Sequence, residues 1–262
     1  ITESHVRTAR HGYLANVSYF DHMLGDLLDT LRQTGLSRNT VILLTADHGD
    51  MLGEHGLWFK KHFFDHASRV PLIVHAPEYF SNGRSLVNVS LVDLLPTLCD
   101  LAGFKVAEHA PQTLDGSSLV SQCEHPEHSN SGAVYAEITS EGVPAPMFMV
   151  RSGQYKLIQG GDVPPVLYDL ANDPEERSNV ADEPELTDTR RSLESLIQDC
   201  WDPASLERDI RLSQRRRRLV HSAHQKGTAP TWDHRPEDPT VPWIHRGPEL
   251  YNDWAWLGIE TP

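Results

Sequence analysis

The first part of the chain alternates between a helical hydrophobic pattern and short apolar runs. From about residue 7 to residue 34, apolar residues recur largely at spacings of three and four. This spacing predicts one helix with an apolar face, with Gly35 as its C-terminal stop. Two runs rich in β-branched residues, 40–45 and 70–75, are too short to be helices. We expect both to be strands buried on both faces, as in the central sheet of an α/β fold flanked by helices.

The pattern changes after Gly103, which is the natural stop of a helical segment expected at 87–103. A loop-like stretch rich in Pro, Gly, His and Ser follows at 104–132. Closely spaced strands with turn residues between them predict an antiparallel sheet, and a helical pattern comes after them. These strand-like runs lie at 133–138, 147–151, 155–159 and 166–170, and the helices at 186–201 and 205–226.

We therefore predict three parts along the chain. Residues 1–103 form part of an α/β core, residues 104–201 form a smaller α+β region, and residues 202–262 form a helix followed by a tail. The tail is rich in proline and carries four of the six tryptophans, Trp232, Trp243, Trp254 and Trp256. Disordered tails are poor in aromatic residues, so we expect this one to pack against its own domain or a neighbouring subunit.

Composition narrows the class of protein. The chain has 23 Lys+Arg against 37 Asp+Glu, a net charge of −14, which argues against nucleic acid as a partner. No run approaches the roughly 20 apolar residues of a membrane span, so we expect no membrane partner. Three irregularly spaced cysteines favour a reducing compartment, and we expect a cytoplasmic protein. Because the chain begins with Ile1, we expect it to be a fragment or a processed product.

The strongest candidate for chemistry is the run from Asp47 to Gly56, which directly follows the first expected strand. Ligand sites in open α/β sheets lie at the C-terminal ends of strands. Asp47 and His48 offer oxygen and nitrogen ligands for a divalent cation, although a turn with a solvated histidine would give the same letters. Lys60, shortly downstream, could bind a sulfate or phosphate dianion; the alternative is an ordinary surface lysine.

These residues carry a resemblance to a known family. The run from Asp47 to Lys60, followed by Arg69-Val70-Pro71-Leu72-Ile73, resembles the C-terminal half of the sulfatase family, in the alkaline-phosphatase-like superfamily. Further similar motifs follow in the expected order at 92–98, 114–119, 150–156 and 167–179. The segments Gly56–Lys60 and 63–65, and the tail motifs at 213–216 and 232–236, resemble choline sulfatases in particular.

The resemblance implies roles for single residues. Asp47 and His48 match the metal-ligand pair of the family, and Lys60 matches the lysine that holds the sulfate. Ca²⁺ is the expected ion, with Mg²⁺ and Mn²⁺ as alternatives. Glu137, or else Glu141, falls where choline sulfatases place a carboxylate near the cationic head group of the substrate; the alternative for Glu137 is a surface acid at a strand end.

The implied activity is hydrolysis of a small organic sulfate ester by a formylglycine nucleophile, made from the cysteine of a Cys-x-Pro-x-Arg motif. Neither Cys99, Cys123 nor Cys200 lies in such a motif. We therefore expect the nucleophile upstream of this chain, and the chain alone to be inactive.

The resemblance also implies that the tail reaches a neighbouring subunit's active site in a homo-oligomer. Two other functions remain open. One is a phosphonate monoester or phosphodiester hydrolase on the same scaffold, and the other is a non-catalytic oligomerisation fragment.

Overall fold

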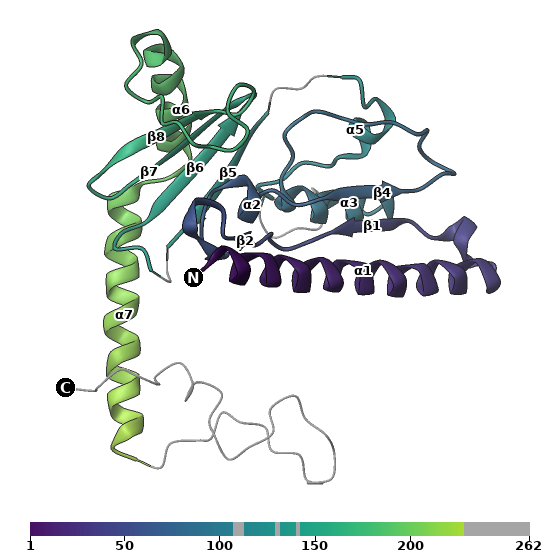
Figure 1. Cartoon of the computed structure of the whole chain (residues 1–262), viewed down its shortest axis with the longest axis horizontal. Coiled ribbons are helices and arrows are strands. Elements are labelled where there is room, and N and C mark those ends of the chain that lie inside the picture. The colour runs from purple at the N-terminus through teal and green to yellow at the C-terminus, as the bar shows by residue number, and fades with distance from the viewer. Residues whose placement is uncertain (107–112, 129–131, 140–141, 228–262) are drawn as a thin grey trace. The chain divides into compact units, whose positions relative to one another are not determined.

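The computed structural model describes residues 1–106, 113–128, 132–139 and 142–227 (Figure 1). The chain divides into two compact units, Ile1–Glu207 and Arg208–Pro262, and each is described by itself. Within these described residues, no helix has the length and apolarity that crossing a membrane requires. The domain boundary expected between residues 103 and 104 lies within the first unit, and it stays a prediction.

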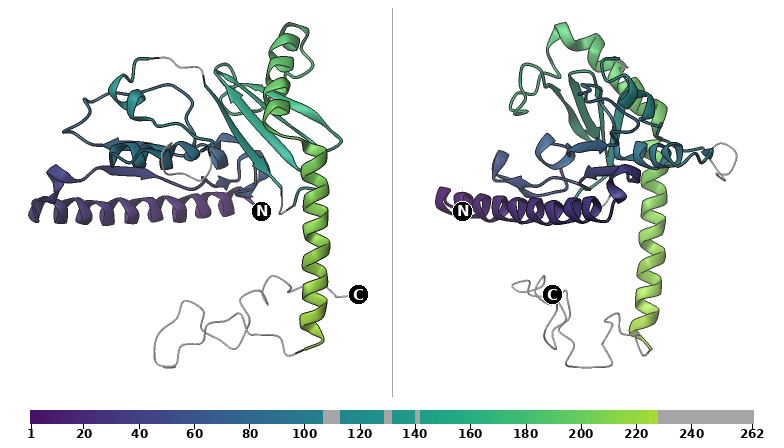
Figure 2. Two further views of the ribbon diagram at one scale, coloured as in Figure 1. Left: turned by 180° about the vertical axis from the view of Figure 1, so that it is seen from behind. Right: turned by 90° about the vertical axis from the view of Figure 1, so that its right-hand side faces the viewer.

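The first unit begins with the long helix α1, Glu3–Gln33, which runs alongside strand β1 (Figures 1 and 2). Thr2 caps its N-terminus, because the Thr2 side chain accepts a hydrogen bond from the backbone N–H of His5. The helix ends before Gly35, whose φ of 74° is the left-handed conformation that favours glycine. The helix predicted from residue 7 to residue 34 is confirmed, with an earlier start.

Strands β1, Ile42–Thr45, and β4, Leu72–His75, pair antiparallel, with Thr45 opposite Leu72. The C-terminal end of β1 therefore lies beside the first residue of β4. The expectation that both strands are buried on both faces is wrong: β1 is only half-buried, and Ile73 in β4 is 55% exposed. The physical reason is that the described residues do not fully cover the apolar side chains of these two strands. Helix α1 likewise contains no buried residue.

Short elements fill the connections around these strands. Strands β2, Met51–Leu52, and β3, Trp58–Phe59, pair antiparallel across the turn that leads to Lys60. Helix α2, Asp65–Ser68, then leads into β4. Three 3₁₀ turns and a further short helix complete this region: η1 Leu36–Asn39, η2 Glu54–Gly56, η3 Leu91–Asp93 and α5 Val120–Glu124.

Helix α3, Leu94–Leu101, is shorter than the helix predicted at 87–103. Ser90 and Asp93 form a capping box, in which the backbone N–H of Ser90 donates to the Asp93 carboxylate at 2.8 Å. This cap starts the helical region at η3 and leaves the residues before it extended.

The antiparallel sheet that the sequence predicted is confirmed, and its four strands have the order β5-β6-β7-β8. Its strands are β5 Ala133–Ile138, β6 Met147–Ser152, β7 Tyr155–Gly160 and β8 Val163–Asp169. The 3₁₀ turn η4, Pro184–Leu186, leads into helix α6, Thr187–Cys200, which covers one face of the sheet (Figure 2). The main buried apolar core lies between them and contains Phe148, Val150, Leu157, Leu167, Ala181, Leu193 and Ile197.

Helix α7, Pro203–Gln225, crosses from the first unit into the second. In the second unit it carries the exposed run Arg215–Arg218. The tail tryptophans Trp232, Trp243, Trp254 and Trp256 lie outside the described residues, so their expected packing stays a prediction.

Candidate active site

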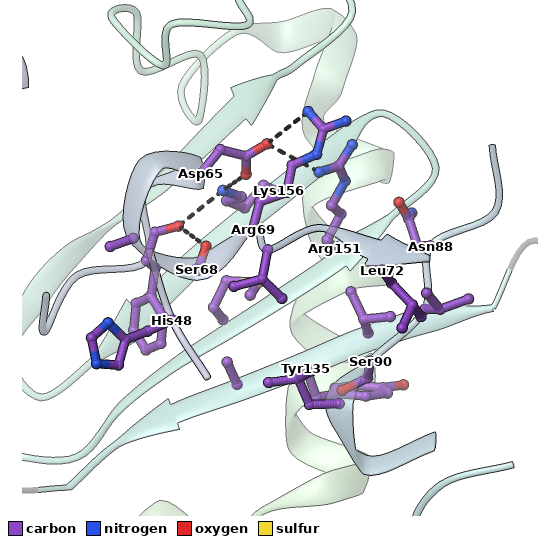
Figure 3. Close-up of a pocket in the computed structure, with 18 of the residues that line it drawn as sticks. His48, Asp65, Ser68, Arg69, Leu72, Asn88, Ser90, Tyr135, Arg151 and Lys156 are labelled. Atoms are coloured by element: carbon purple, nitrogen blue, oxygen red, sulfur yellow. Dashed lines mark hydrogen bonds and ion pairs between the residues drawn. The ribbon is translucent and has the colours of Figure 1, made fainter. Parts of the chain in front are cut away.

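A cavity of about 810 Å³ lies beyond the C-terminal end of β1 (Figure 3). Asp47 and His48 line it directly after the strand, and Lys60 lines it directly after β3. The four-stranded sheet contributes Glu137 from β5 and Arg151 from β6. The structure therefore brings all four candidate residues, Asp47, His48, Lys60 and Glu137, to one cavity.

The imidazole of His48 is oriented by its own turn. Its Nδ1 lies 2.9 Å from the backbone oxygen of Gly49, which can only accept, so Nδ1 carries the proton. Nε2 then holds the free lone pair of a neutral ring. Asp47 closes the same turn, because its Oδ1 accepts the backbone N–H of His48 at 2.9 Å.

Lys60 reaches back to this imidazole. Its Nζ lies 2.9 Å from Nε2 of His48, so the ammonium donates to the lone pair that Nδ1 protonation leaves free. That lone pair can serve Lys60 or a metal cation, but not both at once. The backbone around Lys60 is unusual, because both of its neighbours, Phe59 and Lys61, have positive φ angles of 65° and 79°.

Asp47 and His48 fit the divalent cation that the sequence implies. Asp47 Oδ2 and His48 Nε2 lie 3.4 Å apart. Two adjacent ligands at right angles around Mg²⁺ or Ca²⁺, with bonds of about 2.1–2.5 Å, are separated by roughly 3.0–3.5 Å. One carboxylate oxygen and one imidazole nitrogen also suit Mn²⁺. These two residues can therefore hold one cation together.

Gly49 fixes this turn against α2. Its backbone N–H donates to the carbonyl oxygen of Ala67 at 2.8 Å. A Cβ atom at position 49 would lie 2.1 Å from the backbone oxygen of His66, closer than any real contact allows. Glycine is therefore required for this close approach of two backbones.

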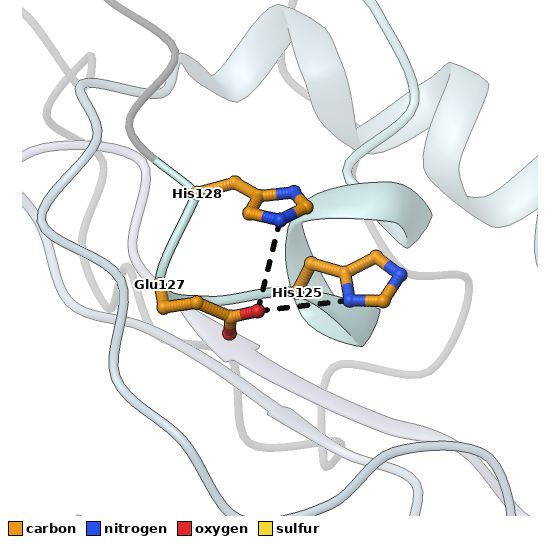
Figure 4. A group of neighbouring side chains, drawn as sticks. All are labelled: His125, Glu127 and His128. Carbon is orange, nitrogen blue, oxygen red and sulfur yellow. Dashed lines mark ion pairs between the residues drawn. The ribbon is translucent and has the colours of Figure 1, made fainter.

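A separate group of three possible metal ligands lies on the surface (Figure 4). Glu127 Oε1 is 3.7 Å from His125 Nδ1 and 3.8 Å from His128 Nε2. All three side chains are exposed, and none of them lines the cavity. No motif in the sequence pointed to this group, and its geometry gives no link to Lys60.

Glu137 lies on β5 opposite Phe148, with an exposed side chain. Its carboxylate is a lining group of the cavity rather than a member of the Asp47, His48 and Lys60 cluster. The alternative, Glu141, lies outside the described residues.

The cavity concentrates positive charge in an acidic protein. The whole chain carries −14, yet the lining contains more basic than acidic side chains. The basic ones are Lys60, Lys61, Arg69, Arg84, Arg151 and Lys156, and the acidic ones are Asp47, Asp65 and Glu137. A local excess of cations favours an anionic ligand.

The residue that the sequence analysis missed is Lys156 in β7. Its side chain is 1% exposed and points away from the core that Leu157 enters, because neighbouring residues of a strand face opposite sides. On that side its ammonium contacts the carboxylates of Asp65 and Glu176. Asp65 follows Lys60 by a few residues, and Glu176 is 2% exposed. A lysine directly before the apolar pair Leu157 and Ile158 of a short strand was the available signal.

Comparison with known proteins identifies the family. The sequence profile described as sulfatase matches residues 2–104, and the profile described as choline sulfatase enzyme C terminal matches residues 208–241. In these stretches the chain matches the sulfatase family. It is 39% identical over 240 residues to a choline-sulfatase of Rhizobium meliloti (strain 1021). That match covers 90% of this chain and 46% of the relative, so the chain spans less than half of that relative's length.

Solved structures show the same fold. The putative sulfatase yidJ from Bacteroides fragilis superposes with a TM-score of 0.69 at 24% identity, over 79% of this chain and 46% of that one. The phosphonate monoester hydrolase SpPMH from Silicibacter pomeroyi superposes with a TM-score of 0.64 at 28% identity, over 74% of this chain and 41% of that one. The fold is the α/β, alkaline-phosphatase-like fold of sulfatases, with an added antiparallel sheet.

Proposed function

We propose that the protein hydrolyses a small organic sulfate ester of the choline sulfate kind. The observation that carries this proposal is the convergence of Lys60, His48 and Asp47 at one cavity rich in cations. The similarity to choline-sulfatase and the match of its C-terminal profile support the same substrate class.

Each site residue has a proposed task. The Lys60 ammonium binds a sulfate oxygen and stabilises the charge that builds on the transferring group. Asp47 Oδ2 and His48 Nε2 hold the divalent cation, which when bound supplies Lewis-acid stabilisation of the same group. Gly49 O keeps the His48 proton on Nδ1, so that Nε2 keeps its lone pair. Glu137 faces the cationic head group from the sheet side of the cavity.

The proposed nucleophile is a formylglycine supplied outside residues 1–262. None of the three cysteines lies in a Cys-x-Pro-x-Arg motif. We therefore expect residues 1–262 alone to hydrolyse neither sulfate nor phosphate esters. Clear turnover by this chain, lost on Asp47→Asn substitution, would contradict the placement of the nucleophile.

The experiment that tests the activity compares ester classes in the protein at its full natural length. Sulfate release from choline-O-sulfate and from an aryl sulfate is measured beside turnover of a phosphonate monoester and a phosphodiester, with Asp47→Asn as the matched inactive variant. We expect the largest kcat/KM for a sulfate ester. A larger value for the phosphonate monoester would favour the second candidate, which rests on the structural similarity to phosphonate monoester hydrolase.

We also propose that the tail mediates assembly into a homo-oligomer. Residues 228–262 contain four tryptophans, and each can bury about 150–250 Å². Deleting the residues from Thr228 onward in the full-length protein should lower the number of subunits per assembly, measured from the mass in solution, and should weaken substrate affinity. An unchanged number of subunits and an unchanged affinity would favour a tail that packs on its own domain.

A further inference from the structure

We infer that Lys156 is a positioning residue, which fastens the Lys60-bearing segment 60–68 to the four-stranded sheet. The role of Lys60 in this inference rests on the proposed function, whereas the fastening itself does not. Lys156 touches none of the groups assigned to the substrate or the cation. It acts on them through the segment that follows Lys60, and Figure 3 shows Lys156 beside Asp65 of this segment.

All three protons of the Lys156 ammonium have an acceptor. Nζ donates to the backbone oxygen of Phe63 at 2.9 Å, to Glu176 Oε1 at 2.7 Å and to a carboxylate oxygen of Asp65. An ammonium has three donors, so its capacity is filled. Two of the three acceptors lie on the segment that follows Lys60. The sheet thus holds this segment through hydrogen bonds that lie a few residues after Lys60.

Glu176 and Arg151 complete the fastening. Glu176 Oε2 accepts the backbone N–H of Asp65 at 2.6 Å, and Arg151 Nη1 lies 3.3 Å from Asp65 Oδ2. The exposed Arg69 also lies 3.7 Å from Asp65 Oδ2, through its Nη1. In the less exposed part of the group, two cations, Lys156 and Arg151, face two carboxylates, Asp65 and Glu176. A buried group of this kind is stable only when its charges are balanced and hydrogen-bonded, which makes its geometry specific.

Backbone strain lies at both ends of this connection. Among the described residues, the non-glycine residues with positive φ are His55, Phe59, Lys61 and Glu176. Phe59 and Lys61 flank Lys60, and Glu176, with a φ of 55°, holds Lys156. Such conformations persist only where the surroundings impose them. On the upstream side Phe59 lies in the β2–β3 pair, and on the downstream side Glu176 accepts a hydrogen bond from Lys156.

The segment also has a second, apolar attachment. The ring of Phe64 stacks on His55 at 4.1 Å and contacts Tyr168 at 6.1 Å between ring centroids. This contact does not involve Lys156. Replacing Lys156 should therefore loosen the backbone beside Lys60 without detaching the whole segment.

The experiment uses the full-length protein and three variants. The paired variant Lys156→Met/Glu176→Gln removes the ammonium together with one carboxylate charge, so that no extra buried charge is left. Glu176→Gln alone is a milder change, kept in case the paired variant does not fold. Arg190→Met is the matched control, because Arg190 forms ion pairs in the same sheet-and-helix region, with Asp182 and Glu194, away from the cavity.

The first measurement is amide hydrogen exchange of residues 57–64. We expect exchange to be about tenfold faster in the paired variant, less so in Glu176→Gln, and unchanged in Arg190→Met. Strand β6 and helix α6 should keep their protection in all variants. Unchanged exchange at 57–64 would overturn the fastening, and this outcome does not depend on the protein being a sulfatase.

The second measurement separates positioning from general structure. The paired substitution is introduced both in the wild type and in Lys60→Met, and kcat/KM for a sulfate ester is compared. A misplaced Lys60 should lower kcat/KM by about tenfold or more in the first background. In the second background, where Lys60 is already absent, the loss should shrink to about twofold or less. Equal losses in both backgrounds would show that Lys156 does not act through Lys60.

Discussion

Lys60 Nζ and His48 Nε2 lie 2.9 Å apart, although 12 residues separate them in the sequence. The pairing of β2 with β3 turns the chain back between them, so that both side chains reach one end of the cavity. One residue offers a positive charge and the other a lone pair. The contact joins a candidate anion-binding group to a candidate metal ligand.

The first prediction concerns Lys60. In the full-length protein, Lys60→Met should lower kcat/KM for a sulfate ester by about 10²-fold or more, because a preorganised charge is lost where charge develops. Sulfate release measures the effect. Arg7→Met is the control, because it removes one exposed cation of α1 that does not line the cavity. Equal losses in the two variants would mean that only net charge matters.

The second prediction concerns the cation. Adding CaCl₂ or MnCl₂ should raise the Tm of the full-length protein, because an ion bound only to the folded state stabilises it by about 2.7 kcal/mol at 100 times its Kd. Asp47→Asn should abolish the rise, as measured by calorimetry. His125→Gln removes one ligand of the surface group and should leave the rise intact. The opposite pattern would assign the ion to the surface group.

The third prediction concerns the core under the sheet. Ile197 on α6 is fully buried among Phe148, Leu157 and Leu193. Ile197→Ala should lower the free energy of unfolding by about 2–5 kcal/mol, because it removes buried methyl groups and leaves a cavity. Urea titration measures the change. Val163→Ala, at a position that is 52% exposed, should have a much smaller effect.

The fourth prediction concerns pH and Asp169, at the end of β8. Desolvation opposes ionisation of this carboxyl, but the hydrogen bonds that it accepts from Asn172, Ala171 and Gln154 outweigh it and lower the pKa of Asp169 below its ordinary 3.8. A lowered pKa in the folded state adds stability that is fully present above the unfolded pKa. This stability is lost as the pH falls through the folded pKa.

Unfolding free energies measured from pH 6 down to about pH 3 should therefore fall less steeply in Asp169→Asn than in the wild type. Asp162→Asn, in the turn between β7 and β8, replaces an exposed aspartate and serves as the control. A wild-type slope retained in Asp169→Asn would show that other carboxyl groups set the acid sensitivity.

The sequence predicted the elements whose hydrophobic period is strong. Helices α1 and α6 lie close to their predicted ranges, because each repeats its apolar positions over many residues. The strands of the four-stranded sheet lie close to theirs, because turn residues separate the short strand-like runs. Asp47, His48 and Lys60 could be chosen because they belong to one short run. Helix α2 and the β2–β3 pair were missed, because a few residues carry no period and their shape is set by tertiary contacts.

The Lys156 cluster could not be foreseen for a different reason. Lys156 lies 20 residues from Glu176 and 91 residues from Asp65 in the sequence. No local pattern links residues so far apart, and a single lysine in a strand is usually exposed. Likewise, periodicity shows which face of β4 is apolar but not whether another segment covers it, which is why the burial of Ile73 was wrongly expected.

The backbone contact at Gly49 has a consequence for attempts to evolve this protein in the laboratory. If codon 49 is fully randomised and functional clones are selected, only glycine should be recovered, because even alanine would collide with the His66 carbonyl. Position 56 should behave differently. Gly56 has a φ of 72° but open space around it, so asparagine or aspartate should survive selection there at reduced fitness. Positions 49 and 56 of one loop would thus differ in the residues recovered from the same library.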